Sequence, residues 1–276
     1  GFSASDLKAA EVSAASLRAG GFSAKYATRH AHHPGLSFTD SINQWAVGSN
    51  HVCRALKMAG FDALDLTTAG YSSKEMYAKG TGYAPIELKE VGHTAKQLRD
   101  AGLPAVMLHE AGYPLPALRS VGFSAQELRQ IGFSATELEV VGFTAHELGK
   151  GGFTTSELKT AGFDVQELRS SGFPTTSLRE GGFTAEDLKM AGAGAKEMKQ
   201  GGFSASELKE IGSTPVELKG AGYTATELKV AGFDSMQLGS AGFSAQQLKV
   251  AGFFPRDLKL AGFKASSAFT LEQLKA

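Results

Sequence analysis

A ten-residue unit, repeated along almost the whole chain, constrains the fold more than any other feature. The unit at residues 202–211 begins with the signals of a helix start. Ser204 is placed to act as the N-cap, and Glu207, three residues later, is placed to complete a capping box. Phe203 and Leu208 have the spacing of a hydrophobic staple across the same turn. The unit therefore predicts one helix of about two turns.

A glycine ends each of these predicted helices. Gly212 falls at the C′ position, where a left-handed backbone favours glycine. From Val91 to Leu260 the units follow one another without insertion, and the last digit of a residue number gives its position in the unit. Glycine is kept at position 2 throughout, and leucine at position 8 is replaced once, by Met198. The aromatic residue at position 3 is replaced at His93, Leu103, Ala193 and Ser213.

The regularity of the repeat divides the chain into three parts. Residues 1–24 hold N-terminal repeats, residues 25–59 form a degenerate and irregular helical segment, and residues 60–276 form one continuous array. The chain opens inside a repeat, at Gly1, and has no initiator methionine. We therefore expect it to be a fragment or a processed product.

A large apolar residue at every fifth position is compatible with two folds, a β-solenoid and an array of short helices. A β-solenoid would turn the residue two places before each leucine inward, and there Gln126, Glu186 and Arg256 would be buried without partners. Alanine, glutamate, leucine and lysine are also strong helix formers and poor strand formers. The sequence therefore predicts an all-α protein.

A helix this short is not stable alone, because helix nucleation is costly. Ala205, Leu208 and Ile211 share one helix face, so each unit must bury that face against its neighbours. Because the corner between units is nearly the same each time, the same rotation recurs. We expect an all-α solenoid with one short helix per repeat.

This pattern resembles the tandem decapeptide arrays, with the consensus Gly-Phe-Ser/Thr-Ala-x-Glu-Leu-Lys, of algal, protist and large-virus proteins. The resemblance covers roughly residues 1–24 and 58–276. It implies a repeat protein and implies no catalytic residues. The irregular segment departs from the pattern, so nothing carries over to it.

Composition excludes several classes of protein. Lysine plus arginine and aspartate plus glutamate each number 28, so the formal net charge is zero, which argues against a polyanion as the main partner. The sequence has no apolar run long enough to predict a membrane span. Cys53 is the only cysteine, so no disulfide can form within the chain, which is compatible with a reducing, intracellular compartment.

The charged residues of the repeat do not predict catalysis. An acid at position 7 and a base at position 9, such as Glu207 and Lys209, recur in most units, whereas acid–base chemistry needs an unusual pair in a distinct environment. We expect these residues to cap helices and to form a solvated face. The sequence predicts no enzyme and no cofactor.

The irregular segment holds the residue types that could bind a metal. These candidates are His30, His32, His33, His51 and Cys53. A zinc site needs four such ligands in a tetrahedron, and this spacing matches no strong zinc motif. Solvent-exposed helix ends are the alternative interpretation. Cys53 with a nearby histidine also suggests a nucleophile, but it has no orienting acid.

The variable positions 6 and 10 offer candidates for partner binding. Val230, Val250 and Leu260, at position 10, are spaced by ten or twenty residues and could line one ridge, and Trp45 is the only tryptophan. Repeat proteins present binding faces through variable residues on a fixed frame, although neutral drift on a solvated surface would also produce such variation.

These observations predict a non-enzymatic scaffold or linker that binds other proteins, as a structural subunit of a larger assembly. One alternative is a modular nucleic-acid-binding solenoid, which requires a basic stripe and a steep salt dependence. The other is a metal or small-ligand site in residues 25–59.

Overall fold

The computed structural model describes residues 53, 56–57, 60–77 and 82–264. All regular secondary structure in these residues is α-helical, which confirms the all-α prediction. The chain divides into two compact units, residues 1–133 and 134–276. The predicted N-terminal repeats, and all of the irregular segment except residues 53, 56 and 57, lie outside the described residues.

The helices are short and recur with the repeat. In the first unit they are α5 (Ala63–Thr68), α6 (Ser73–Tyr77), α7 (Pro85–Glu90), α8 (Ala95–Asp100), α9 (Ala105–Glu110), α10 (Leu115–Ser120) and α11 (Ala125–Gln130). In the second unit they are α12 (Ala135–Val140), α13 (Ala145–Lys150), α14 (Thr155–Thr160), α15 (Val165–Ser170), α16 (Thr175–Glu180), α17 (Ala185–Met190), α18 (Ala195–Gln200), α19 (Ala205–Glu210), α20 (Pro215–Gly220), α21 (Ala225–Val230), α22 (Ser235–Ser240), α23 (Ala245–Val250) and α24 (Pro255–Leu260).

The start of α19 shows how four residues specify a helix N-terminus. The hydroxyl of Ser204 accepts a hydrogen bond from the backbone N–H of Glu207 at 3.2 Å. The carboxylate of Glu207 in turn accepts one from the backbone N–H of Ser204 at 2.7 Å. Two N–H groups that an isolated helix would leave unpaired are thereby satisfied, as the sequence predicts.

The end of α19 is equally well defined. Gly212 has a φ of +82°, a conformation that side chains with a Cβ disfavour. Its N–H donates to the carbonyl of Lys209 at 2.9 Å, and the N–H of Ser213 donates to the carbonyl of Leu208 at 2.9 Å. This pair of bonds is a Schellman motif, and it turns the chain toward the next repeat.

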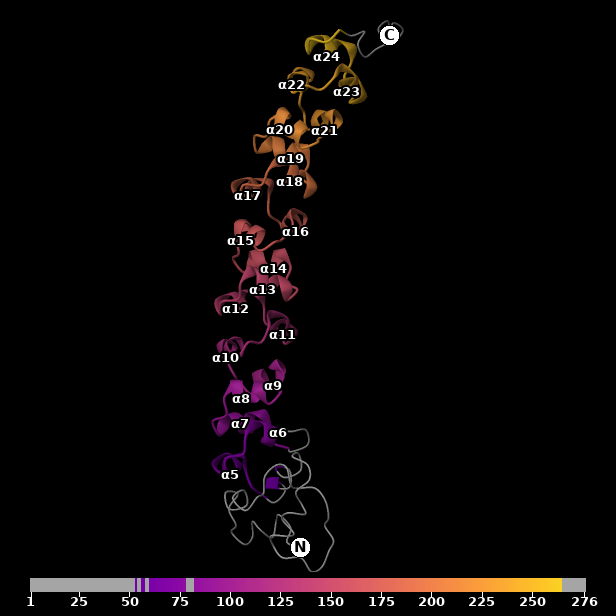
Figure 1. The fold of residues 1–276 in the computed structure, drawn as a ribbon. Helices are drawn as coiled ribbons and strands as arrows, with labels where there is room; N and C mark the ends of the chain where they lie inside the picture. The colour runs from indigo at the N-terminus through magenta and orange to yellow at the C-terminus, as the bar shows by residue number, and fades with distance from the viewer. Residues whose placement is uncertain (1–52, 54–55, 58–59, 78–81, 265–276) are drawn as a thin grey trace, which may run out of the picture. The chain divides into compact units, whose positions relative to one another are not determined.

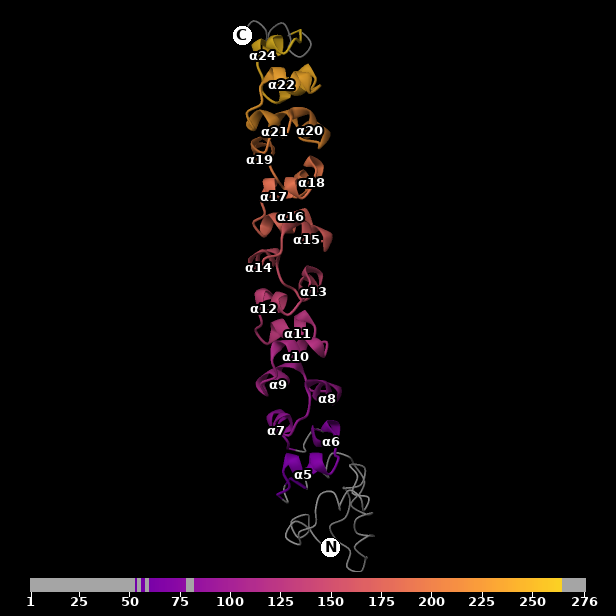
Figure 2. The same ribbon diagram turned by 90° about the vertical axis from the view of Figure 1, so that its left-hand side faces the viewer.

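Within each unit, helices stack on the helix two places along the chain. In the second unit α12, α14, α16, α18, α20, α22 and α24 pack in succession, and α13 packs on α15, α15 on α17, α19 on α21, and α21 on α23. Figures 1 and 2 show these short helices lying across the direction in which they are stacked. Each unit is thus a solenoid built from two columns of helices, with two repeats to each turn.

The interior is made of the same few positions in every repeat. The position-8 leucines, such as Leu208, have no exposed surface, and Met198 takes the same place in α18. Ala205, at position 5, and Phe203, at position 3, are also buried. Because each short helix buries its single apolar face against the next turn, stability comes from contacts between repeats rather than within one.

Candidate binding surface

The position-9 cation is the main polar connection between turns. The ammonium of Lys209 donates to the carbonyls of Gly232 at 2.7 Å and Ala231 at 3.0 Å, at the C-terminal end of α21. The same nitrogen lies 4.6 Å from the centre of the Phe233 ring. One side chain therefore binds the negative end of a helix dipole and the face of an aromatic ring, both one turn of the solenoid away.

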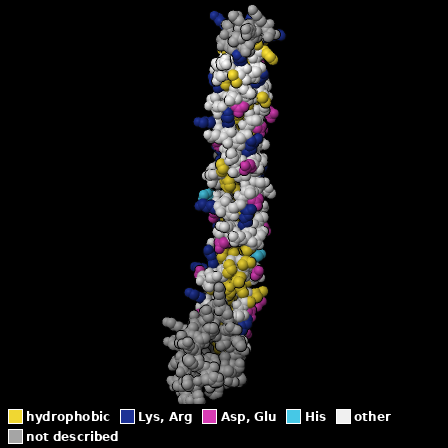
Figure 3. Space-filling model, turned by 90° about the vertical axis from the view of Figure 1, so that its right-hand side faces the viewer, with side chains coloured by type: hydrophobic (Ala, Val, Ile, Leu, Met, Phe, Trp, Pro, Cys, Tyr) yellow, Lys and Arg dark blue, Asp and Glu magenta, His cyan; other side chains and the backbone are white. Residues whose placement is uncertain are grey.

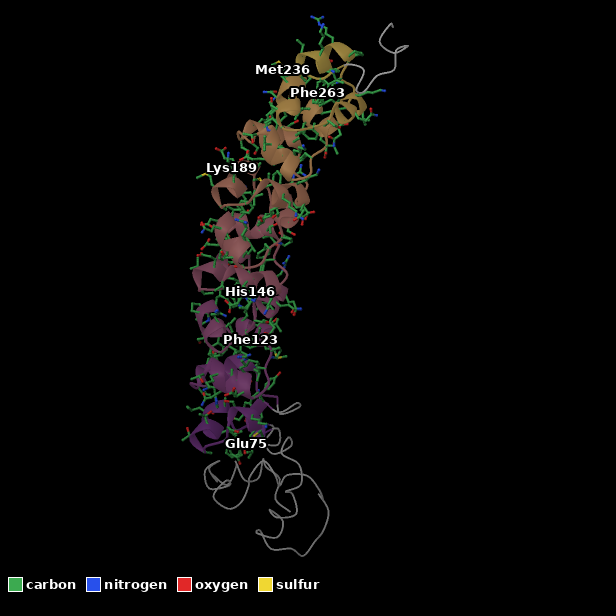
Figure 4. The ribbon with its side chains drawn as sticks, turned by 45° about the horizontal axis from the view of Figure 1, so that its top comes forward. Glu75, Phe123, His146, Lys189, Met236 and Phe263 are labelled. Carbon is green, nitrogen blue, oxygen red and sulfur yellow. The ribbon has the colours of Figure 1, made fainter. Side chains whose placement is uncertain are left out.

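The same arrangement recurs along both units, and we call it the cation ladder. Its cation–ring pairs are Lys57–Tyr83, Lys89–Tyr113, Arg99–Phe123, Lys159–Phe183, Arg179–Phe203, Lys199–Tyr223, Lys209–Phe233, Lys219–Phe243 and Lys229–Phe253. Phe123 is labelled in Figure 4. These cations do more than form the solvated face that the sequence predicts, because their charged groups also bind the backbone of another turn, as those of Lys209 and Lys229 do.

Acidic residues at position 7 join the same network. Arg169 forms an ion pair with Glu197 at 2.9 Å, and Lys199 forms one with Glu227 at 3.4 Å. Partial burial acts to raise the pKa of Glu207, but hydrogen bonds from the backbone and hydroxyl of Ser204, and the charge of Arg179, outweigh it and hold that pKa below its usual value. The predicted capping role is confirmed, and ion pairing between turns is added to it.

Where position 9 lacks a lysine or arginine, the aromatic ring one turn of the solenoid further on is only half-buried. This holds for Phe133, Phe163, Phe173 and Phe263, whose position-9 partners are His109, Glu139, Gly149 and Gly239. At Gly149 the ring has taken the place of the missing side chain, since a Cβ there would meet Phe173 Cζ at 2.6 Å. The cation therefore shields the ring as well as binding it.

His93 replaces the aromatic residue in the first unit and is buried. Its Nδ1 is 2.6 Å from the hydroxyl of Ser73, and its Nε2 is 2.9 Å from the hydroxyl of Thr67. Burial lowers the pKa of His93, which favours the neutral ring. Ser73 is itself buried, so the two hydroxyls hold a neutral ring in place between turns of the solenoid.

Two of the predicted partner-binding residues lie in one column of helices. Val230 in α21 is 80% exposed and Val250 in α23 is 73% exposed, and these two helices pack on one another. Leu260 is also exposed, but it lies in α24, which stacks on α22 in the other column and contacts α23 as its neighbour along the chain. The ridge therefore consists of Val230 and Val250 without Leu260, and their role in binding stays a prediction.

Sequence reasoning missed a second set of exposed aliphatic residues, at position 6. Leu64, Ile86 and Val106 are exposed and hold equivalent places in α5, α7 and α9, of which α7 and α9 pack together. Figure 3 shows hydrophobic side chains gathered on one face of the first unit. The sequence does contain this pattern, as aliphatic residues at position 6 of every second repeat. The pattern indicates a shared face only when each helix is known to stack on the helix two places along the chain.

Most of the remaining predicted site residues fall outside the part of the chain that the structure describes. His30, His32, His33, Trp45 and His51 lie outside the described residues, and Cys53 is buried. Among the residues that are described, no group of three or more potential ligands could hold a metal ion. None of the described helices combines the length and the apolar character that a membrane crossing needs.

The fold and the repeating contacts define the class of this protein: an α-helical repeat protein with a ten-residue unit. The family described as the decapeptide repeat region matches residues 50–125, 82–155, 142–215 and 192–265, and the chain belongs to that family. No curated protein matches the chain, and no solved structure matches it.

Proposed function

We propose that the protein is a non-enzymatic scaffold that binds partner proteins through exposed side chains at position 10 of its repeats. The observation that carries this proposal is the ridge of Val230 and Val250, two exposed aliphatic side chains on helices that pack together. Aligned apolar side chains on an exposed face are typical of contacts with another protein.

The chemistry of the repeat supports a structural rather than a catalytic role. The charged side chains at positions 7 and 9 bind backbone groups, rings and one another, as in Lys199 with Gly222 and Glu227. This weighs against the nucleic-acid alternative too, because lysines that hold the solenoid together are less able to neutralise phosphates.

A crosslinking pull-down from the native source tests the proposal with matched variants. We expect the double variant Val230→Glu and Val250→Glu to lose a partner that the wild-type chain captures. The control carries Thr226→Glu and Gln246→Glu, which add the same charge to exposed position-6 residues of the same two helices. Equal capture by the wild type and both variants would exclude the ridge as the contact surface.

A further inference from the structure

Two successive turns of the second unit lack, in one column of helices, the aromatic ring that the turns beyond them contain. At position 3 of successive repeats in one column, Ala193 and Ser213 replace the aromatic residue, whereas Phe233 and Phe253 restore it. A hollow of about 440 Å³ lies at these two residues. Its lining includes Met198, Gly194 and Gly220, and a Cβ placed on either glycine would meet nothing within 4 Å.

The cation of the ladder is nevertheless in place above this hollow. Lys189, labelled in Figure 4, donates to the carbonyl of Ile211, as Lys209 donates to that of Ala231 two repeats later. Lys209 lies over Phe233, but Ser213 at the corresponding place offers Lys189 no ring. Backbone and cation are thus arranged for an aromatic ring that this part of the chain does not supply.

The tyrosines of the array show which ring fits this place best. The hydroxyl of Tyr223 donates to the carbonyl of Phe203 at 2.6 Å, and that of Tyr83 donates to the carbonyl of Phe61 at 2.8 Å. The acceptor in each case is the position-3 carbonyl two repeats earlier. For a ring at the place of Ser213, that acceptor is the carbonyl of Ala193.

We propose that the hollow at Ala193 and Ser213 binds a phenol ring from outside the chain, with the ring under Lys189 and its hydroxyl directed to the carbonyl of Ala193. A free phenolic compound or the tyrosine side chain of another protein would supply this chemistry. The proposal is independent of the ridge of Val230 and Val250, because it rests on a different surface and on ring recognition.

Ligand-observed NMR with p-cresol and with the tripeptide Gly-Tyr-Gly tests this proposal on the full chain. We expect p-cresol to bind, and binding of the tripeptide as well would identify a tyrosine of another protein as the source. We expect 4-methylanisole, which has the same ring but cannot donate a hydrogen bond, to bind about three-fold more weakly. Lys189→Met should weaken p-cresol binding about three-fold through loss of the cation.

The substitution Ser213→Tyr fills the hollow with the chain's own phenol and should abolish binding while raising the melting temperature. Ser213→Ala, which leaves the hollow open, should bind p-cresol as the wild type does. A melting curve followed by circular dichroism verifies that each variant is folded. Absence of p-cresol binding to the wild type, or unchanged binding by folded Ser213→Tyr, would overturn the proposal.

Discussion

The space between turns of the solenoid is filled in different ways at two places, one in each unit. In the first, buried His93 is held by the hydroxyls of Ser73 and Thr67. In the second, the corresponding place holds Phe233 under the ammonium of Lys209. Both solutions fill the volume and satisfy the polar atoms around it. The comparison teaches that the repeat requires a filled space and paired polar groups, and that the residues meeting this requirement can differ.

Removal of the ring should have the largest effect on stability. Phe233→Ala should lower the free energy of unfolding by about 3–5 kcal/mol, because a buried aromatic side chain leaves a cavity. Phe163→Ala is the matched control, since Phe163 is only half-buried and has Glu139 where the ladder has a cation. Urea denaturation followed by circular dichroism measures both. An equal loss in the two variants would contradict the shielding role that we assign to the cation.

The turn glycines should be next in importance. Gly232→Ala should cost about 1–2 kcal/mol, because Gly232 has a φ of +80° and a Cβ would lie 3.1 Å from the ammonium of Lys209. Gly220→Ala is the control: Gly220 is helical, and its Cβ would meet nothing within 4 Å. That substitution should stabilise the protein by about 0.5–1 kcal/mol. Urea denaturation should therefore give changes of opposite sign, and a loss at Gly220 would contradict this account.

Much of this fold follows from local rules, and the remainder does not. The cap at Ser204, the acid at Glu207 and the turn at Gly212 obey rules that span three or four residues, so the sequence predicts them. The reach of Lys209 to Phe233 depends on how each corner rotates the next helix. No rule of local spacing gives that rotation. Without that rotation, the sequence could not show that Leu260 lies in a different column from Val230 and Val250. It also could not show that Ala193 and Ser213 lie next to one another.

The stability that buried His93 contributes in the first unit should depend on pH, whereas the contribution of Phe233 in the second unit should not. Because burial lowers the folded-state pKa of His93, the unfolded chain binds a proton more readily, and stability is lost as the pH falls below about 6.5. Melting temperatures measured between pH 7.5 and 5.5 should therefore fall. In His93→Phe they should fall less over the same range. Parallel curves for the two proteins would show that His93 does not titrate in this window.

The central claim is that each position-9 cation acts on the ring one turn further along the solenoid. A double-mutant cycle with Lys209→Met and Phe233→Leu measures this directly by urea denaturation. We predict a coupling energy of about 0.5–1 kcal/mol between these two residues. We predict additive effects for Lys209→Met with Phe243→Leu, since Phe243 lies under Lys219 instead. Additivity in the first cycle would contradict the cation ladder.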